Sequence, residues 1–223
     1  MIHSCRNFRL TCTLLLLAAL GACAQSSQKH KKINTMNESA SVQAKTDTAT
    51  LGNGCFWCTE AVFQQLEGVI RVASGYSGGH VENPNYKEVC TGATGHAECL
   101  QILFDPSKIS FDELLEVFWQ THDPTTLNRQ GNDIGTQYRS AVFYHNEEQK
   151  AKAQKYIDAL NKSGAWDKPV VTSLEPFVKF YKAEDYHQNY YNDNPEQGYC
   201  QMVVRPKVEK FQKVFKDKLK KNQ

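Results

Sequence analysis

Apolar residues along most of this 223-residue chain recur with a period of two or with a period near 3.6. Short runs rich in β-branched and aromatic residues predict strands at 48–51, 69–74, 98–104, 140–144 and 170–174. Segments with apolar residues every three or four positions predict helices at 59–66, 110–119, 146–160 and 208–219. Because strands and helices alternate without an internal repeat or a second linker, we predict a single α+β layered domain.

Two of the predicted helices carry additional signals. Ser110 followed by Glu113 has the pattern of a capping box and predicts the start of the helix at 110–119. In the segment 208–219 the apolar side chains share one face, with lysines opposite, which predicts a helix docked on the domain rather than a membrane or calmodulin-binding helix.

The N-terminal 22 residues have the pattern of an export signal. Arg6 and Arg9 precede an apolar stretch from Leu10 to Ala22, which is too short to span a membrane as a mature helix. The sequence Leu-Gly-Ala-Cys at 20–23 resembles the lipobox of bacterial lipoproteins, in which the signal is cut before the cysteine and Cys23 is then lipidated. An ordinary secretory cleavage site is the alternative. We therefore expect an exported lipoprotein, anchored to the membrane at the periplasmic, outer-membrane or cell-surface side.

Composition divides the rest of the chain into a tether and a folded domain. Residues 23–49, from Cys23 onward, are rich in Ser, Gln, Lys and Thr and bury too little apolar surface to fold, so they predict a disordered tether. Residues 50–223 are predicted to form the catalytic domain. Removal of 1–22 deletes two of the 26 Lys and Arg residues and leaves 24 basic against 24 acidic side chains, which argues against nucleic-acid binding.

The candidate chemistry begins with the run Gly-Cys-Phe-Trp-Cys at 54–58. Gly52 and Gly54 mark a tight turn between a strand and a helix, so Cys55 is predicted at the N-terminus of that helix. Free backbone N–H groups and the helix dipole favour a thiolate there, which predicts a lowered pKa for Cys55 and a nucleophile. An inert buried cysteine is the alternative, but the turn, the two aromatic residues and the second cysteine favour a reactive one.

A second candidate group is a carboxyl at the start of an apolar strand. Glu98 follows a glycine-hinged loop at 92–98, and burial there is expected to raise its pKa, so that it stays protonated near neutral pH and acts as a general acid. A solvated charge at the strand end is the alternative. Tyrosines beside the glycine-rich loops predict a pocket for a polar, uncharged group.

Several motifs occur together in one order: Gly-Cys-Phe-Trp at 54–57, Gly-Tyr-x-Gly-Gly at 75–79, Thr-Gly-His-Ala-Glu at 94–98, Gly-Asn-Asp-x-Gly-x-Gln-Tyr-Arg-Ser at 131–140, and Tyr-His-Gln-x-Tyr-Tyr at 186–191. Over residues 50–205 the chain thereby resembles the peptide methionine sulfoxide reductase A (MsrA) family. The resemblance implies a ferredoxin-like two-layer α+β sandwich and a monomeric enzyme with no bound cofactor. It also implies reduction of the S epimer of methionine sulfoxide in proteins and peptides.

The resemblance also implies roles for individual residues. Cys55 would attack the sulfoxide sulfur, and Glu98 would protonate the sulfoxide oxygen. The other implied site residues shape the pocket: Phe56 and Trp57 as an apolar wall around the methyl group, Tyr190 in substrate binding, Tyr86 and Tyr138 as hydrogen-bond donors to the oxygen, and Asp133 in support of the hydrogen-bond network.

The reaction leaves Cys55 as a sulfenic acid, which a second thiol must resolve to a disulfide. Cys200 matches the resolving position of the family and is expected to react first, whereas Cys58 stands where the family more often has glycine. Resolution by Cys58, or a relay through both, stays open. A thioredoxin-like protein docking near Cys200, or dithiothreitol in the test tube, would reduce the disulfide. Cys99 is expected in the core and Cys90 in a structural role.

Two alternatives come from other classes of protein. The Cys-x-x-Cys pair is also typical of thioredoxin-type oxidoreductases, which need neither Glu98 nor the tyrosines. A structural zinc site could draw on Cys55, Cys58, Cys90, Cys99 and His96, but only one closely spaced ligand pair is present.

Overall fold

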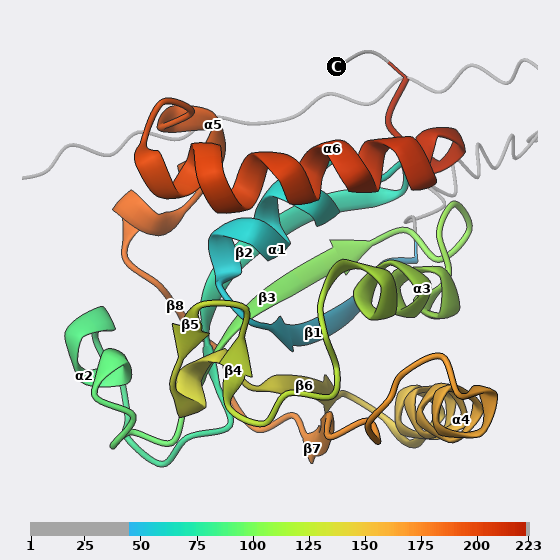
Figure 1. Ribbon diagram of the computed structural model, residues 1–223, viewed down its shortest axis with the longest axis horizontal. Helices are drawn as coiled ribbons and strands as arrows, with labels where there is room; N and C mark the ends of the chain where they lie inside the picture. Colours follow the sequence, from blue (N-terminus) through green and yellow to red (C-terminus); the bar gives the residue numbers. More distant parts are fainter. Residues whose placement is uncertain (1–44, 222–223) are drawn as a thin grey trace, which may run out of the picture. The chain divides into compact units, whose positions relative to one another are not determined.

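The computed structural model describes residues 45–221, and the predicted signal segment, Cys23 and most of the tether lie outside this part of the chain. A six-stranded sheet in the order β7-β6-β1-β3-β2-β8 forms the centre of the domain (Figure 1). Its strands are β1 (Asp47–Asn53), β2 (Val69–Ser77), β3 (Ala97–Phe104), β6 (Ser140–Tyr144), β7 (Ser173–Pro176) and β8 (Tyr181–Lys182). A separate two-stranded ribbon pairs β4 (Arg129–Gln130) with β5 (Asp133–Ile134).

The helices are of very different lengths. The α-helices are α1 (Phe56–Phe63), α2 (Tyr86–Cys90), α3 (Phe111–Thr121), α4 (Glu147–Ser163), α5 (Tyr190–Asp193) and α6 (Arg205–Val214). Short 3₁₀ turns lie at η1 (Thr136–Tyr138), η2 (Asp185–His187) and η4 (Lys216–Lys218), and a π-helical turn, η3 (Cys200–Val204), leads into α6. Within residues 45–221 no helix combines the length and apolar character needed to cross a membrane.

The longer strands and two of the helices make a ferredoxin-like unit. The chain runs β1-α1-β2-β3-α3-β6, and the four strands lie side by side as β6-β1-β3-β2 with every neighbouring pair antiparallel. The predicted ferredoxin-like α+β class is therefore confirmed. β7 extends the sheet in parallel to β6, and β8 extends it at the other edge beside β2.

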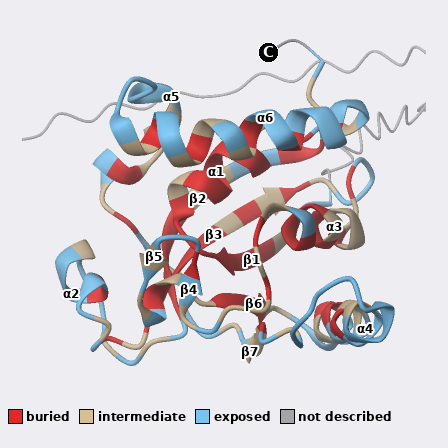
Figure 2. Ribbon diagram, viewed as in Figure 1, coloured by how far each residue is buried: buried red, intermediate tan, exposed pale blue. Residues whose placement is uncertain are grey.

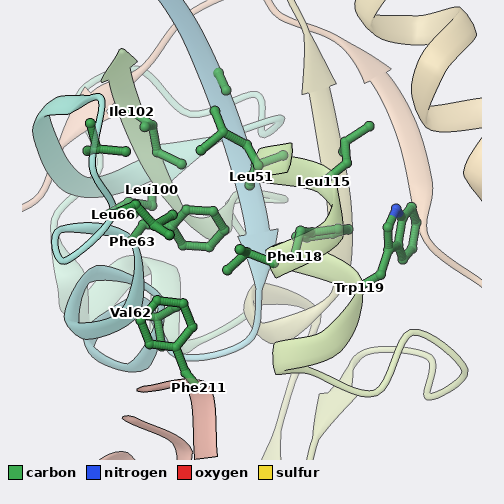
Figure 3. Close-up of a cluster of buried hydrophobic side chains, with 14 of the residues drawn as sticks. Leu51, Val62, Phe63, Leu66, Leu100, Ile102, Leu115, Phe118, Trp119 and Phe211 are labelled. Carbon is green, nitrogen blue, oxygen red and sulfur yellow. The ribbon is translucent and has the colours of Figure 1, made fainter. Parts of the chain in front are cut away.

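The two faces of the sheet are both covered. Side chains alternate along β3, so Leu100 and Ile102 point to the main core, which α1, α3 and α6 complete with Phe63, Phe118 and Phe211 (Figure 3). Cys99 points the other way and packs with Phe143 and the segment that carries Phe177 and Phe180. The expectation that Cys99 belongs to the core is confirmed, and by the same alternation Glu98 lies on the helix-covered face.

Two predicted boundaries at the sheet were wrong. β1 starts at Asp47, so residues 47–49 of the predicted tether belong to the sheet, where Asp47 pairs with Phe104. Residues 170–172 are not strand, because the N–H of Val170 bonds to the Asn161 side chain and that of Val171 to the carbonyl of Pro124. Only from Ser173 does the segment pair with β6.

The predicted helix at 208–219 is shifted towards the N-terminus. α6 begins at Arg205 and ends at Val214, where Phe215 leaves helical geometry, and residues 216–218 form a 3₁₀ turn. Its apolar residues Val208 and Phe211 are buried against α1 and the remainder faces solvent, as predicted for a docked helix (Figure 2). The Ser110 capping box of α3 is present. A helix not predicted from the sequence, α2, has its own capping box between Asn85 and Glu88.

Candidate active site

The candidate nucleophile lies on the turn between β1 and α1. Gly54 has φ +91°, and a Cβ there would come within 2.6 Å of the Gln130 side chain, so both the backbone and the space require glycine. Cys55 is the N-cap residue of α1, and its carbonyl accepts the N–H groups of Cys58 and Thr59. The Thr59 hydroxyl bonds to Asn53 at the end of β1 and thus ties the helix back to the strand. The predicted place of Cys55 at a helix N-terminus is confirmed.

A cavity of about 230 Å³ opens beside Cys55. It collects side chains from the β1–α1 turn, α1, α2, β3, β5, η1 and the segment before η3: Cys55, Phe56, Trp57, Tyr86, Glu98, Asp133, Tyr138 and Tyr199. Residues far apart in the sequence therefore meet in one pocket. All but Tyr199 are residues for which the sequence predicted a role.

Glu98 is buried at the cavity wall, with 1 % of its surface exposed. Its Oε2 accepts the N–H of Phe56 at 3.1 Å. Burial raises the pKa of Glu98 to about 8, and the charge of Asp133 acts in the same direction, while the bond from Phe56 opposes them. The carboxyl is therefore protonated at neutral pH and has a proton to donate, as expected from the sequence.

The expected pKa of Cys55 was wrong. Cys55 is only 6 % exposed, and burial together with its hydrogen bond to Cys58 raises its pKa well above the usual value. The same hydrogen bond lowers the pKa of Cys58 to about 7. The helix N-terminus alone does not offset the loss of hydration, so the two thiols act as a pair that loses its first proton near neutral pH.

Two tyrosines predicted to contact the substrate oxygen line the cavity. Burial, followed by the charge of Glu98, raises the pKa of both Tyr86 and Tyr138, so both phenols keep their protons and act as hydrogen-bond donors. Their position in the cavity is consistent with the predicted binding of a polar, uncharged group.

Asp133 works through a residue that the sequence analysis had not assigned to the site. The Tyr199 hydroxyl donates to Asp133 Oδ2 at 2.6 Å and closes one side of the cavity. The signal that could have identified Tyr199 is its position next to Cys200, the thiol that the family resemblance implies as the resolving one.

Trp57 is surrounded by aromatic rings. Tyr190 stacks on the indole at 3.8 Å between ring centroids and 8° between planes, and it does not line the cavity. The predicted role of Tyr190 in substrate binding would therefore have to act through Trp57. The indole Nε1 donates to His187 Nδ1 at 3.2 Å, a contact that the sequence alone does not indicate.

The remaining thiols are placed as follows. Cys200 is fully buried at the start of η3, and burial, followed by the charge of Cys58, raises its pKa. Cys90 is exposed at the end of α2 and all of the cysteines in the described part of the chain are reduced.

Within residues 45–221 no three His, Cys, Asp or Glu side chains group together as metal ligands.

His96, considered above as a zinc ligand, has both ring nitrogens engaged in the fold. Its Nδ1 accepts the N–H of Gly79 at 3.0 Å, and its Nε2 donates to the carbonyl of Val81 at 2.7 Å. The ring thus fastens the glycine loop at 78–81 to the strand that carries Glu98.

A thiol pair at a helix N-terminus that faces a protonated carboxylic acid places the molecule among the thiol oxidoreductases that use an acid as well as a nucleophile. The comparisons with known proteins define the family. Residues 47–219 match the family model described as peptide methionine sulfoxide reductase, and the chain belongs to that family.

The relatives are similar over nearly their whole length. The chain is 58 % identical over 174 residues to the peptide methionine sulfoxide reductase MsrA of Saccharolobus solfataricus, covering 78 % of this chain and 97 % of the relative. It is 57 % identical over 187 residues to MsrA 1 of Rhodopirellula baltica, covering 82 % and 96 %.

Solved structures agree. Reduced Mxr1 of Saccharomyces cerevisiae superposes with a TM-score of 0.66 at 37 % identity over 71 % of this chain and 91 % of that chain. Methionine sulfoxide reductase A of Corynebacterium diphtheriae gives 0.64 at 36 % identity over 72 % and 80 %. The chain is therefore an oxidoreductase of the MsrA type, and it acts on peptide methionine sulfoxide.

Proposed function

We propose that Cys55 and Glu98 together reduce the S epimer of methionine sulfoxide in peptides and proteins. One observation carries this assignment: the carboxyl of Glu98 is bound to the N–H of the residue that follows Cys55, inside the same cavity. The acid is therefore held at a fixed place relative to the sulfur, and its raised pKa keeps it protonated.

The chemistry needs both groups. The Cys55 thiolate attacks the sulfoxide sulfur while a proton from Glu98 goes to the oxygen, which joins Sγ to the substrate sulfur. The hydroxyl then passes to Sγ as the S–O bond and the new sulfur–sulfur bond break, which leaves Cys55 as a sulfenic acid. Methionine leaves as the thioether. The Cys58 thiolate accepts the proton of Cys55 along their hydrogen bond, which supplies the nucleophile despite the raised pKa of Cys55.

The cavity offers different surfaces to the substituents of the sulfoxide. Phe56 and Trp57 form an apolar side for the methyl group, and Glu98 with Tyr86 and Tyr138 forms a donor side for the oxygen. With Cys55 at the same cavity, only one epimer presents methyl and oxygen to the matching sides. The family resemblance gives this epimer as S.

We infer that Cys58 resolves the sulfenic acid first and that Cys200 then attacks the new disulfide. Cys58 is hydrogen-bonded to Cys55. Cys200 feels the charge of Cys58, which raises its pKa. Condensation of the sulfenic acid with the Cys58 thiol releases water and forms the first disulfide. Thiolate exchange moves it to Cys58 and Cys200 and restores Cys55 as a thiol. This order differs from the one that the family resemblance favoured.

The activity is tested with the purified protein, dithiothreitol, and peptides that carry either the S or the R epimer. We expect turnover of the S epimer alone and none of either epimer in Cys55→Ser. Turnover of both epimers at similar rates would contradict the proposed arrangement of methyl and oxygen sides.

The N-terminal sequence supports an exported, lipid-anchored enzyme that repairs proteins outside the cytoplasm, and the family resemblance supports a monomer. The predicted lipid attachment at Cys23 and the tether after it carry this part of the proposal. A thioredoxin-like protein on the same side of the membrane then supplies the electrons. Labelling of cells with an alkyne fatty acid should mark the wild-type chain and not Cys23→Ala, and label retained in Cys23→Ala would contradict lipidation there.

A further inference from the structure

The last segment of the described chain is strongly basic. Residues 205–221, which form α6, η4 and the turn after them, carry eight Lys or Arg side chains and two Asp or Glu side chains. The chain from Cys23 onward has equal numbers of basic and acidic side chains, so the remainder of it has six more acidic than basic ones. Positive charge is therefore concentrated on this segment although the whole is neutral.

Three lysines of this segment point away from the domain. Val208 and Phe211 bury one side of α6 against α1. Lys210 and Lys213 are exposed and share the opposite side, because residues three apart lie on the same side of a helix, and Lys216 is exposed on η4 (Figure 2). These three exposed lysines are called the basic face below.

The charges of the basic face are not neutralised within the domain. Lys218, on the same segment, turns inward to pair with Glu113 at 2.6 Å, and Lys220 donates to the carbonyl of Gln64 at 2.8 Å. By contrast, no lysine of the basic face makes an ion pair within residues 45–221. All three charges are therefore available to an anionic partner.

The basic face lies near the point where the tether enters the domain. In the sheet, Phe104 pairs with both Asp47, the first residue of β1, and Val69, the first residue of β2. Just before β2, the N–H of Glu67 donates to the carbonyl of Lys218 in η4 at 2.8 Å. The start of β1 and the end of the basic segment therefore lie at the same end of the domain (Figure 1).

The length of the tether keeps this end close to the proposed lipid anchor. Residues 23–46, which precede β1, number 24. For the flexible chain that their composition predicts, the root-mean-square distance between the two ends is about 25–30 Å. A domain held so close to a lipid surface meets the headgroups at a high effective concentration, so a weak attraction between charges is enough to dock it.

We propose that the basic face docks on anionic lipid headgroups of the membrane that holds the anchor. The inference rests on the proposed lipid attachment at Cys23. Opposite charge and the entry of the tether at the same end of the domain both favour this partner. The apolar side of α6 stays buried in the domain, so the contact is made at the membrane surface and the helix does not insert.

Docking at this end leaves the cavity open. β1 runs from the tethered end to the turn that carries Cys55, and its seven residues span about 20 Å. No lysine of the basic face lines the cavity. The docked enzyme therefore still receives peptides from solution.

The test uses residues 24–223, which keep the tether and every contact described above but carry no lipid. Binding is measured by sedimentation with vesicles of phosphatidylglycerol, which are anionic, or of phosphatidylcholine, which are neutral. We expect binding to the anionic vesicles alone. In 1 M salt, where charges are screened beyond about 3 Å, this binding should be lost.

Two triple variants test the face itself. Each lysine near an anionic surface strengthens binding by about fivefold, so we expect Lys210→Gln, Lys213→Gln and Lys216→Gln together to weaken binding about 100-fold. The control removes the same charge from three exposed lysines of α4 and the segment after it: Lys155, Lys162 and Lys168. The control variant should bind nearly as the wild type does. The tether is the same in all variants, so its own lysines do not produce the difference.

Activity on a dissolved, uncharged sulfoxide peptide is measured in the same samples. The value of kcat/KM should be the same with and without anionic vesicles, and a tenfold fall on docking would overturn the open orientation. Equal binding to both kinds of vesicle, or tighter binding to soluble polyglutamate than to vesicles, would overturn anionic lipid as the partner.

The anchor and the basic face can fail separately. A wild-type chain that takes no fatty-acid label in cells, while its vesicle binding depends on the basic face, overturns the anchor alone. A labelled chain whose vesicle binding is weakened equally in the two triple variants overturns the basic face alone, because the effect then follows net charge and not position.

Discussion

Oε2 of Glu98 lies 3.1 Å from the backbone nitrogen of Phe56, the residue that follows Cys55. The bond joins the start of β3 to the first turn of α1, so the proposed general acid and the proposed nucleophile are placed by one contact between two elements. This contact also limits how far the acid can retreat from the sulfur. The fold thus fixes the position of Glu98 relative to Cys55, and burial raises the pKa of Glu98 so that its carboxyl keeps its proton.

Replacing the acid should slow the reduction of the sulfoxide far more than the reduction of the enzyme. Glu98→Gln keeps the shape and an acceptor for the Phe56 N–H but has no acidic proton. We expect the rate of methionine formation to fall by about 10²- to 10⁴-fold, the usual worth of a general acid. Glu175→Gln is the control, since this carboxylate pairs with Arg139 and does not line the cavity. Equal losses in the two variants would rule out the proposed role.

The same step should have a bell-shaped dependence on pH. The thiol pair must lose a proton, and the pKa of Cys58 is about 7, so the rate rises with pH through that value. Glu98 must keep its proton, and its pKa is about 8, so the rate falls as the pH rises further. Single-turnover rates between pH 5 and 10 measure both limbs. The alkaline limb should be absent in Glu98→Gln, and its persistence there would assign it to another group.

The order of the thiols can be read from the disulfides that accumulate. In Cys200→Ser, one equivalent of substrate should leave a disulfide between Cys55 and Cys58, identified by mass spectrometry of an alkylated digest. In Cys58→Ser, the Cys55 sulfenic acid should live longer and be trapped by dimedone, because its nearest resolving thiol is gone. A disulfide of Cys55 with Cys200 that forms in Cys58→Ser at the wild-type rate would show that Cys200 resolves directly.

Gly54 should be the most sensitive glycine of the site. In Gly54→Ala the residue would have to keep φ +91° and its methyl group would meet Gln130. We therefore expect the free energy of unfolding to fall by about 2 kcal/mol or more, together with lower activity. Gly164→Ala is the matched control, because this glycine also has positive φ but open space around it. For Gly164→Ala we expect the free energy of unfolding to fall by about 1 kcal/mol and the activity to be unchanged. Denaturant unfolding gives both values.

The sequence predicted those parts of the fold that depend on residues close together along the chain. The Ser110 capping box, the turn before Cys55 and the burial of Glu98 at the start of a strand all appear as expected. The end of α6 and the start of β7 do not follow from such patterns, because contacts with distant segments decide them: Leu66 bridges to Leu219, and Val171 bonds to Pro124.

In the candidate site, too, local motifs predicted some features and contacts between distant residues decided the others. Motifs identified the residue types that line the cavity, whereas the pKa of Cys55 depends on burial and on the contact with Cys58, which no spacing reveals. Tyr199 and His187 were not assigned to the site for a similar reason. Each acts through one hydrogen bond to a residue more than sixty positions away in the chain, Tyr199 to Asp133 and His187 to Trp57.

The most direct test of the account is a single turnover without reductant. The reduced protein is mixed with less than one equivalent of peptide carrying the S epimer, quenched from milliseconds to completion, and analysed for methionine peptide and for disulfides. We predict a burst of S-epimer reduction in the wild type, its loss in Cys55→Ser, its slowing in Glu98→Gln, and one disulfide at completion for each methionine formed. Methionine formation in Cys55→Ser, or an undiminished burst in Glu98→Gln, would contradict the account.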